Sequence, residues 1–540
     1  MAVMRSRKSH LTHTDRPAIL FVLACAFACL IAGSLSAAVS AEETQRGYIV
    51  VLRDQVKGPA QVAREHVEKF DGDHLGAVFR HAIKGYAAEF SDEELTAVRK
   101  DPRVDYVEPD APLELAAQTA STGIKRVFGM SNGNLFINQV NDKWADVDVA
   151  VLDTGSEPSH PDLNIYRRTD CYGVGVECID GAGTPEHNHG SAVAGIIGAI
   201  DNGSGVVGVA HGARIWSVKV YRSNFGNSAS DYFQGLDWVK AHADEIEVIN
   251  SSVTAGTDFK TFEAIQQSLN DAGVINIAAA GNEGWSVQYV PGASDLVVTV
   301  SGIADYNGSP GGGGAPPAGC SAAGADDQRA TFSNYGPKVD ITAPAVCVAT
   351  TATVGSGVIA PSGTSFAAPH VAGAAALLAM QKDPDSAADV EWIKKTLEEE
   401  GNLNWTDTSG DGIKEPLLDV GDGSTFDMRV APDAKTGGAS ELQATTVKMH
   451  GSINPRNDST TYQVEYGPST SYGSKAPTAP KSAGSGVVPV AIEEPLTNLT
   501  PSTTYHYRLV ATNSKGTVYG ADRTFTTPRR YVPRFDAESY

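Results

Sequence analysis

The sequence GTSFAAPHVAG, residues 363–373, places a serine at the start of a long apolar helix. The N-terminus of a helix carries a partial positive charge, which can stabilise an alkoxide or a developing oxyanion at Ser365. A serine that only caps a helix would look similar in isolation. Capping does not explain the small residues that follow Ser365, which allow a buried helix to approach a sheet closely. The segment therefore predicts a reactive serine beside a sheet.

Two further segments place reactive side chains at the ends of predicted elements. Residues 149–155, VAVLDTG, form an apolar strand that ends in Asp153 before a glycine that permits a tight turn. Residues 189–195, HGSAVAG, start a buried helix with His189, whose side chain suits proton transfer near neutral pH. Taken alone, Asp153 fits a turn cap and His189 fits a packed histidine. Neither segment by itself establishes a catalytic site.

Short apolar runs alternate with amphipathic helices between residues 147 and 401. Strands are expected at 147–152, 215–220, 247–253 and 274–280, and helices at 228–244 and 258–272. Strands that are apolar on both faces and separated by helices predict a parallel sheet covered on each side. Reactive groups then belong at the carboxyl ends of the strands.

In their order along the chain, the three motifs resemble the signatures of the subtilisin-like serine proteases, especially the proteinase K-like branch. The resemblance implies that Ser365 attacks the scissile carbonyl, His189 transfers the proton and Asp153 orients the imidazole. A fourth match, AAGN at residues 279–282, implies that Asn282 donates to the oxyanion.

The segment NSSVT, residues 250–254, resembles the family's substrate-binding strand. The resemblance implies two walls for the bound peptide, formed by Ser252 and Val253 on one side and by Ala280 and Gly281 on the other. Thr254 stands where the family usually has glycine, and its bulk is expected to narrow the pocket. Two other histidines near the motifs, His187 and His370, are expected to be structural.

Residues 48–110 have the strand and helix order βαββαβ, typical of a small split-βαβ unit. This segment resembles the inhibitor prodomain that precedes the family's catalytic domains. An exposed linker is expected at 111–121, and we expect the enzyme to cut it near Ala116 or Gln118. The released prodomain is then expected to inhibit the enzyme until it is degraded.

The N-terminus has basic residues, an apolar run at 18–32 and small residues ending at Ala41, an order that predicts a secretory signal peptide. The alternative, a membrane anchor, needs about 20 apolar residues, more than this run provides. Cleavage after Ala41 removes Cys25 and Cys29. Four cysteines remain in the exported chain, and proximity favours bonds from Cys171 to Cys178 and from Cys320 to Cys347 over the other pairings. A zinc site is the alternative, but the C-x-x-C pair it needs is missing.

The C-terminal region alternates polar and apolar residues between 437 and 527, which predicts about seven antiparallel strands in a sandwich. It resembles fibronectin type III-like modules of bacterial exported proteins. Such modules bind polymers or space domains, and the sequence does not choose between these roles.

A net charge of -22 argues against a nucleic-acid partner, because phosphate binding needs clustered Lys and Arg. No cofactor is expected for catalysis. Structural calcium is possible: Asp407, Ser409 and Asp411 alternate as in a calcium loop, but the terminal glutamate is missing. The calcium ligands therefore stay unassigned.

The sequence thus predicts an α/β catalytic domain with a parallel sheet, preceded by a small α+β prodomain and followed by an all-β sandwich. The expected segments are a signal peptide at 1–41, prodomain and linker at 42–116, catalytic domain at 117–425 and sandwich at 437–528. We expect a secreted, extracellular, monomeric serine endopeptidase that cuts polypeptide substrates through an acyl-enzyme, without a stable membrane span. The alternative is a surface or matrix binding protein with an inactive protease fold. The complete triad argues against it.

Overall fold

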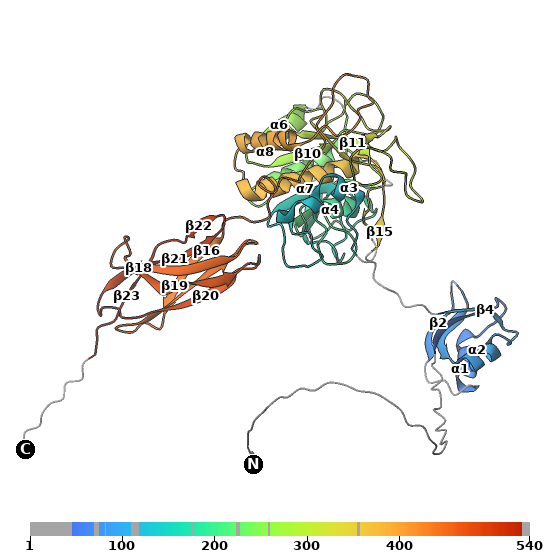
Figure 1. The fold of residues 1–540 in the computed structure, drawn as a ribbon, viewed down its shortest axis with the longest axis horizontal. Helices are drawn as coiled ribbons and strands as arrows, with labels where there is room; N and C mark the ends of the chain where they lie inside the picture. The colour runs from blue at the N-terminus through green and yellow to red at the C-terminus, as the bar shows by residue number, and fades with distance from the viewer. Residues whose placement is uncertain are drawn as a thin grey trace, which may run out of the picture. The chain divides into compact units, whose positions relative to one another are not determined.

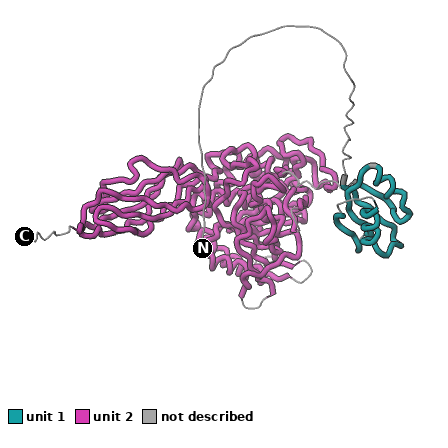
Figure 2. The backbone as a smooth tube through the Cα atoms, turned by 90° about the horizontal axis from the view of Figure 1, so that it is seen from below, with its two compact units in different colours: residues 1–114 teal, residues 115–540 magenta. Residues whose placement is uncertain are grey.

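The computed structural model describes residues 46–69, 75–81, 83–109, 118–173, 177–222, 227–256, 260–353 and 357–531. The chain divides into two compact units, Met1–Glu114 and Leu115–Tyr540 (Figure 2). The expected signal peptide with its cleavage after Ala41, and the expected cleavage near Ala116, lie outside the described residues.

The first unit has the order of strands and helices that its sequence predicts. Its elements are β1 (Arg46–Leu52), α1 (Pro59–Lys69), β2 (Leu75–Phe79), β3 (Gly85–Phe90), α2 (Asp92–Val98) and β4 (Val104–Pro109). In its described part the strands form one antiparallel sheet in the order β2-β3-β1-β4. Helix α2 begins with the expected capping box, in which Ser91 and Glu94 each accept a hydrogen bond from the other's N–H.

The second unit is built around a mainly parallel sheet. Within the described residues its strands follow the order β12-β11-β10-β9-β5-β8-β6-β7, and β13 also pairs with β11. The bounds are β5 (Asp148–Asp153), β6 (Ile165–Asp170), β7 (Ile179–Asp180), β8 (Arg214–Lys219), β9 (Val248–Ser251), β10 (Ile275–Ala279), β11 (Val298–Ala304), β12 (Gln328–Arg329) and β13 (Ile341–Pro344). Only β7 and β12, at the two edges, pair antiparallel. The predicted parallel α/β fold is confirmed.

Helices cover both faces of this sheet (Figure 1). One core contains residues of α4 (His189–Gly198), α7 (Thr364–Lys382) and α8 (Ala387–Glu400), and the other those of α5 (Ala229–Lys240) and α6 (Lys260–Asn270). Along β5, Val149 and Val151 join the first core while Ala150 and Leu152 join the second. Because side chains alternate along a strand, burial on both faces explains the continuous apolar run before Asp153.

Several short elements complete this part of the chain. They are α3 (Thr122–Arg126), the 3₁₀ helices η1 (Gly129–Ser131) and η2 (Gly133–Leu135), and the paired strands β14 (Thr350–Thr351) and β15 (Val358–Ile359).

The prediction that an exposed linker extends to Ser121 is wrong at its C-terminal end. Gln118 is 9% exposed, and its side-chain amide donates to the carbonyls of Ile200 and Val206 at 3.2 and 3.1 Å. Ser121 is buried as the N-cap of α3. Contacts with residues far along the chain, rather than local sequence, fix this segment.

Two disulfide bonds close loops of the second unit. Cys171 is joined to Cys178 and Cys320 to Cys347, with Cα atoms 4.3 and 5.9 Å apart, the pairs that proximity favours. The N–H of Cys347 donates to Ser362 Oγ at 2.9 Å. The second bond thus ties a glycine- and proline-rich loop to the segment that leads into α7.

The C-terminal region consists of strands, as predicted. In the described residues there are eight, not seven: β16 (Asp433–Ser440), β17 (Val447–Asn454), β18 (Thr460–Gly467), β19 (Ser474–Gly484), β20 (Val490–Leu496), β21 (Thr504–Asn513), β22 (Gly516–Tyr519) and β23 (Arg523–Thr526). They form two sheets, β16-β17-β20 and β19-β18-β21-β22, with β23 also paired to β21. Side chains from both sheets share one core, as in a sandwich. Among the helices of the described residues, none is long and apolar enough to cross a membrane.

Candidate active site

Asp153 lies at the carboxyl end of β5, between β8 and β9 near the middle of the sheet. Its side chain is 1% exposed, and the N–H of Thr154 donates to Oδ1 at 2.7 Å. Gly155 then adopts a φ of 88°, which favours glycine. A Cβ at Gly190 would lie 2.4 Å from the Gly155 carbonyl oxygen. The two glycines therefore allow the strand that carries Asp153 to touch the helix that carries His189.

His189 begins helix α4 and faces Asp153. Its Nδ1 lies 2.8 Å from both carboxylate oxygens of Asp153. Burial lowers the pKa of His189, but the charge of Asp153 and its hydrogen bond raise it more, so that the pKa lies above its ordinary value. With Nδ1 donating to the carboxylate, the other ring nitrogen, Nε2, is left to accept a proton.

Ser365 lies in the first turn of α7, after Gly363, whose φ of 150° favours glycine. In this conformation the Ser365 hydroxyl donates to the carbonyl oxygen of Ser252 at 3.3 Å, and no hydrogen bond of the described residues joins it to His189. The imidazole instead packs on the next side chain, Phe366, with ring centroids 5.1 Å apart. Phe366, the residue after Ser365, thus lies against the His189 ring, and no hydrogen bond joins the two proposed catalytic side chains in this conformation.

Asn282 follows β10 and is held by its amide oxygen. That oxygen accepts from the N–H and the hydroxyl of Thr364 at 2.8 and 3.1 Å. No residue in the described part of the chain accepts a hydrogen bond from the NH₂ group, so this group can donate to a ligand. Thr364 was not identified from the sequence, since its only signal is its place before Ser365.

A cavity of about 410 Å³ lies over the aspartate and the histidine. Its walls are Asp153, Thr154, His187, His189, Tyr221, Ser252, Val253 and Thr254. Ser252, Val253 and Thr254 line it, whereas Ala280 and Gly281 are buried and are not among its walls. Tyr221 had no sequence signal.

His187 and His370, the two other histidines near the motifs, have different surroundings. His187 was expected to be structural, but it is exposed, lines the cavity, and accepts from the His189 N–H through Nδ1 at 3.1 Å. His370 is fully buried, its Nδ1 bonds the Phe366 carbonyl at 2.9 Å, and burial lowers its pKa to about 4. Only His370 therefore has the expected structural environment.

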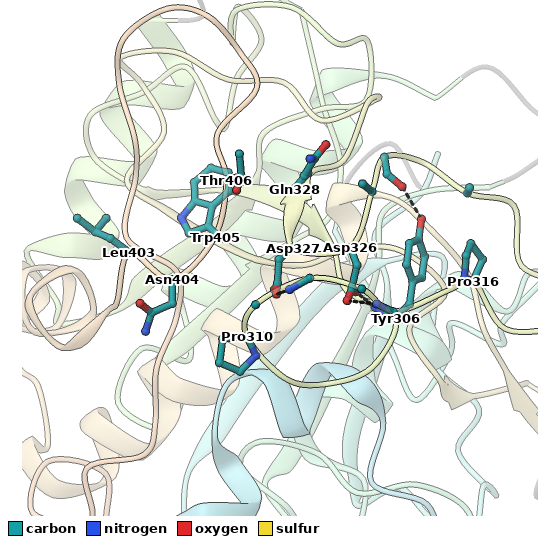
Figure 3. Close-up of a pocket in the computed structure, with 17 residues that line it drawn as sticks. Tyr306, Pro310, Pro316, Asp326, Asp327, Gln328, Leu403, Asn404, Trp405 and Thr406 are labelled. Carbon is teal, nitrogen blue, oxygen red and sulfur yellow. Dashed lines mark hydrogen bonds between the residues drawn. The ribbon is translucent and has the colours of Figure 1, made fainter.

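A larger cavity, about 940 Å³, lies beside the glycine-rich loop 311–314 and Trp405 (Figure 3). Asp326 and Asp327 line it, but their carboxylates accept from loop N–H groups, including Gly314 at 2.6 Å and Gly312 at 2.8 Å. These carboxylates therefore shape the loop. The smaller cavity, which contains the imidazole, is the better candidate for chemistry.

The described part of the chain contains no group of three His, Cys, Asp or Glu side chains arranged to hold a metal. In the segment singled out by its alternating oxygens, Ser409 Oγ lies 2.8 Å from a carboxylate oxygen of both Asp407 and Asp411.

The fold and this site define the class of hydrolases that use an activated serine. The model of the subtilase family matches residues 145–413, and that of the peptidase inhibitor I9 family matches residues 47–116. An alkaline protease of Alkalihalobacillus alcalophilus is 32% identical over 412 residues, which cover 74% of this chain and 97% of that protein.

Subtilisin E of Bacillus subtilis (strain 168) is 30% identical over 384 residues, covering 71% of this chain and 91% of the relative. A solved structure titled S41 Psychrophilic Protease aligns with 29% identity and a TM-score of 0.47, covering 56% of this chain and 99% of that one. The chain belongs to the subtilase family. It is a serine endopeptidase with an I9 prodomain, and nothing found supports the alternative of an inactive binding protein.

Proposed function

We propose that Ser365, His189 and Asp153 are the catalytic triad of this endopeptidase. Ser365 attacks the scissile carbonyl, His189 accepts its proton at Nε2 and returns it to the leaving amine, and water then hydrolyses the acyl-enzyme. The observation that carries the proposal is the contact of His189 Nδ1 with both oxygens of a buried Asp153. This contact fixes the tautomer and stabilises the imidazolium as it forms.

The amide of Asn282 is proposed to donate to the oxyanion. The proposal is supported by the two bonds from Thr364, which hold the amide oxygen and so orient the NH₂ group. Together with the N–H of Ser365, it would stabilise charge that develops only during attack. Loss of such a donor in a subtilisin lowers kcat by about 10²–10³-fold.

Maturation is proposed to proceed by self-cleavage between the I9 prodomain and the catalytic domain. Because Gln118 is buried on the catalytic domain, the cut is expected in the segment 110–117 that precedes it. The free prodomain then acts as the inhibitor. Together with the signal-like N-terminus and two disulfide bonds, this describes a secreted, extracellular zymogen that acts as a monomer on polypeptides.

One experiment tests the triad and the maturation together. The full chain and its Ser365→Ala variant are expressed and exported without any other protease. The parent chain should lose its prodomain, hydrolyse casein, and stop when a sulfonyl fluoride modifies Ser365, whereas the variant should stay full length and inactive. Normal processing of Ser365→Ala would contradict self-cleavage, and a modified serine other than Ser365 would contradict the triad.

Structural calcium is proposed around Asp162 rather than in the 407–411 segment. Asp162 is 2% exposed, and burial raises its pKa to about 6. Among the described residues its carboxylate accepts only from the Asn202 amide and the Val206 N–H, at 2.9 and 3.0 Å. The carbonyls of Ile200 and Val206 lie beside the Gln118 amide. Calcium binding would require the side-chain amides of Gln118 and Asn202 to turn, which would break the bonds that their oxygens accept from the N–H groups of Gly203 and Ser204 at 3.1 and 2.9 Å. Carboxylate, amide and carbonyl oxygens are the ligands that Ca²⁺ prefers.

A chelator should therefore lower the melting temperature of the parent enzyme, and added Ca²⁺ should restore it. Asp162→Asn should melt at a lower temperature and lose its response to Ca²⁺, whereas Asp407→Asn should keep the parent's response. Equal responses of the parent and Asp162→Asn would exclude this location.

A further inference from the structure

Helix α7 lacks one of its own hydrogen bonds next to Ser365. In an α-helix the carbonyl of each residue accepts from the N–H four residues later, and for Ser365 that residue is Pro369, which has no N–H. A proline ring also crowds the carbonyl four residues before it. The carbonyl of Ser365 therefore needs a donor from outside the helix.

Ser252, which follows β9, supplies this donor. Its hydroxyl donates to the Ser365 carbonyl oxygen at 2.8 Å. Asn250, fully buried within β9, donates from its amide to the same hydroxyl at 2.9 Å. A hydroxyl has one proton and can accept as well as donate. Because Asn250 occupies the acceptor side, the single proton of Ser252 is directed to Ser365.

Two hydrogen bonds join Ser252 and Ser365, and they involve different parts of Ser365. The Ser365 hydroxyl donates to the Ser252 carbonyl at the longer distance of 3.3 Å, and this bond must break when the hydroxyl turns to His189. The bond from Ser252 Oγ to the Ser365 carbonyl involves only the main chain of Ser365. It can therefore persist while the nucleophile rotates.

We propose that Ser252 is a positioning residue for the nucleophile. Its hydroxyl replaces the helical hydrogen bond that Pro369 removes, and so holds the main chain of Ser365 in place for attack and for donation from its N–H. This role is additional to the peptide-binding wall inferred from the sequence. It rests on the proposed function of Ser365.

The first test compares Ser252→Ala with Ser252→Thr in the mature enzyme. The alanine variant should lower kcat about tenfold, as expected for one lost hydrogen bond near the reacting atoms, with KM changed less than about twofold. Threonine keeps a hydroxyl and should restore kcat to within about threefold. A rise in KM at unchanged kcat would overturn the proposal, because that pattern belongs to a substrate wall.

The second test is a double-mutant cycle with Pro369. In Pro369→Ala the helix regains an N–H for the Ser365 carbonyl, so adding Ser252→Ala should then lower kcat only about twofold. The same fold loss in both backgrounds would overturn the proposal. If Pro369→Ala does not fold, the comparison of Ser252→Ala with Ser252→Thr still tests the proposal.

Thermal melting separates positioning from a general loss of stability. Ser252→Ala should melt within a few degrees of the parent while its kcat falls, and a parallel loss of folded protein and kcat would overturn the proposal. Failure of the triad itself has a different signature, because the parent enzyme would then react with a sulfonyl fluoride at a residue other than Ser365.

Discussion

At the scale of residues, Asp153 and His189 differ in their access to water. The Asp153 side chain is 1% exposed and the His189 side chain 24%. A buried carboxylate without a counter-charge is unfavourable, and its nearest ionisable partner is the imidazole. In the proposed mechanism, a proton that arrives on His189 during attack creates an ion pair whose carboxylate is already desolvated and oriented. The pair would then stabilise the transition state more than the resting enzyme.

The pH dependence of kcat/KM follows from this pair. Activity should fall as the pH drops through the pKa of His189, because the protonated ring cannot accept a proton. Since Asp153 raises that pKa, the acidic limb should lie above the ordinary 6.5. Asp153→Asn should move the limb to lower pH and reduce kcat by about 10⁴-fold. Asp271 is exposed, so Asp271→Asn is the control and should leave the acidic limb in place. An acidic limb that Asp153→Asn does not move would contradict the assignment of Asp153 as the partner of His189.

Thr254 should limit the size of the substrate side chain that the cavity accepts, because it lines the cavity where the family usually has glycine. Thr254→Gly removes the threonine side chain. It should raise kcat/KM for peptides with a bulky aromatic residue before the cut by about tenfold and leave alanine peptides nearly unchanged. Peptide-library digestion measures both, and an equal change for all peptides would exclude this role.

At the scale of elements, the sequence predicts four central strands of the sheet, β5, β8, β9 and β10, but not the other described strands, and it predicts contacts between elements poorly. The run before Asp153 is predictable because burial on both faces requires apolar residues throughout, and β5 occupies nearly the expected residues. The packing of Gln118 is not predictable, because its partners, Ile200 and Val206, lie about eighty residues away. Likewise, the bonds between Thr364 and Asn282 depend on the start of α7 meeting the loop that follows β10.

Helix α4 offers a test of the close packing between Gly190 and the Gly155 backbone. A Cβ at Gly190 would lie 2.4 Å from a backbone oxygen, whereas at Gly198, on the same helix, the nearest atom is 3.4 Å away. Gly190→Ala should force His189 away from Asp153 and lower kcat/KM at least about tenfold. Gly198→Ala should be active and up to about 1 kcal/mol more stable. Similar kinetics and melting temperatures for the two variants would contradict the argument.

At the scale of the whole molecule, the sandwich is hydrogen-bonded to the catalytic part of the second unit. Asn457, 3% exposed, donates from its amide to the carbonyls of Trp144 and Met428 at 2.7 and 2.9 Å. Arg456 lies 3.1 Å from Asp146, and Asp146 also pairs with Arg214, the first residue of β8. The catalytic sheet and the sandwich thus share a polar network. The sandwich is therefore expected to stabilise the enzyme as well as extend it.

Asn457→Ala tests this coupling. The variant should lower the free energy of unfolding by about 1–3 kcal/mol, because one buried and one partly buried carbonyl lose their donor. Asn457 has a φ of 67°, a conformation that alanine adopts poorly, so part of the loss is backbone strain. Asn498→Ala is the matched control, since Asn498 has a φ of 59° in the same sandwich but is exposed. Thermal melting of casein-hydrolysing activity measures the catalytic part directly. A larger loss at Asn457 than at Asn498 is expected, and equal losses would mean that the sandwich does not stabilise the protease.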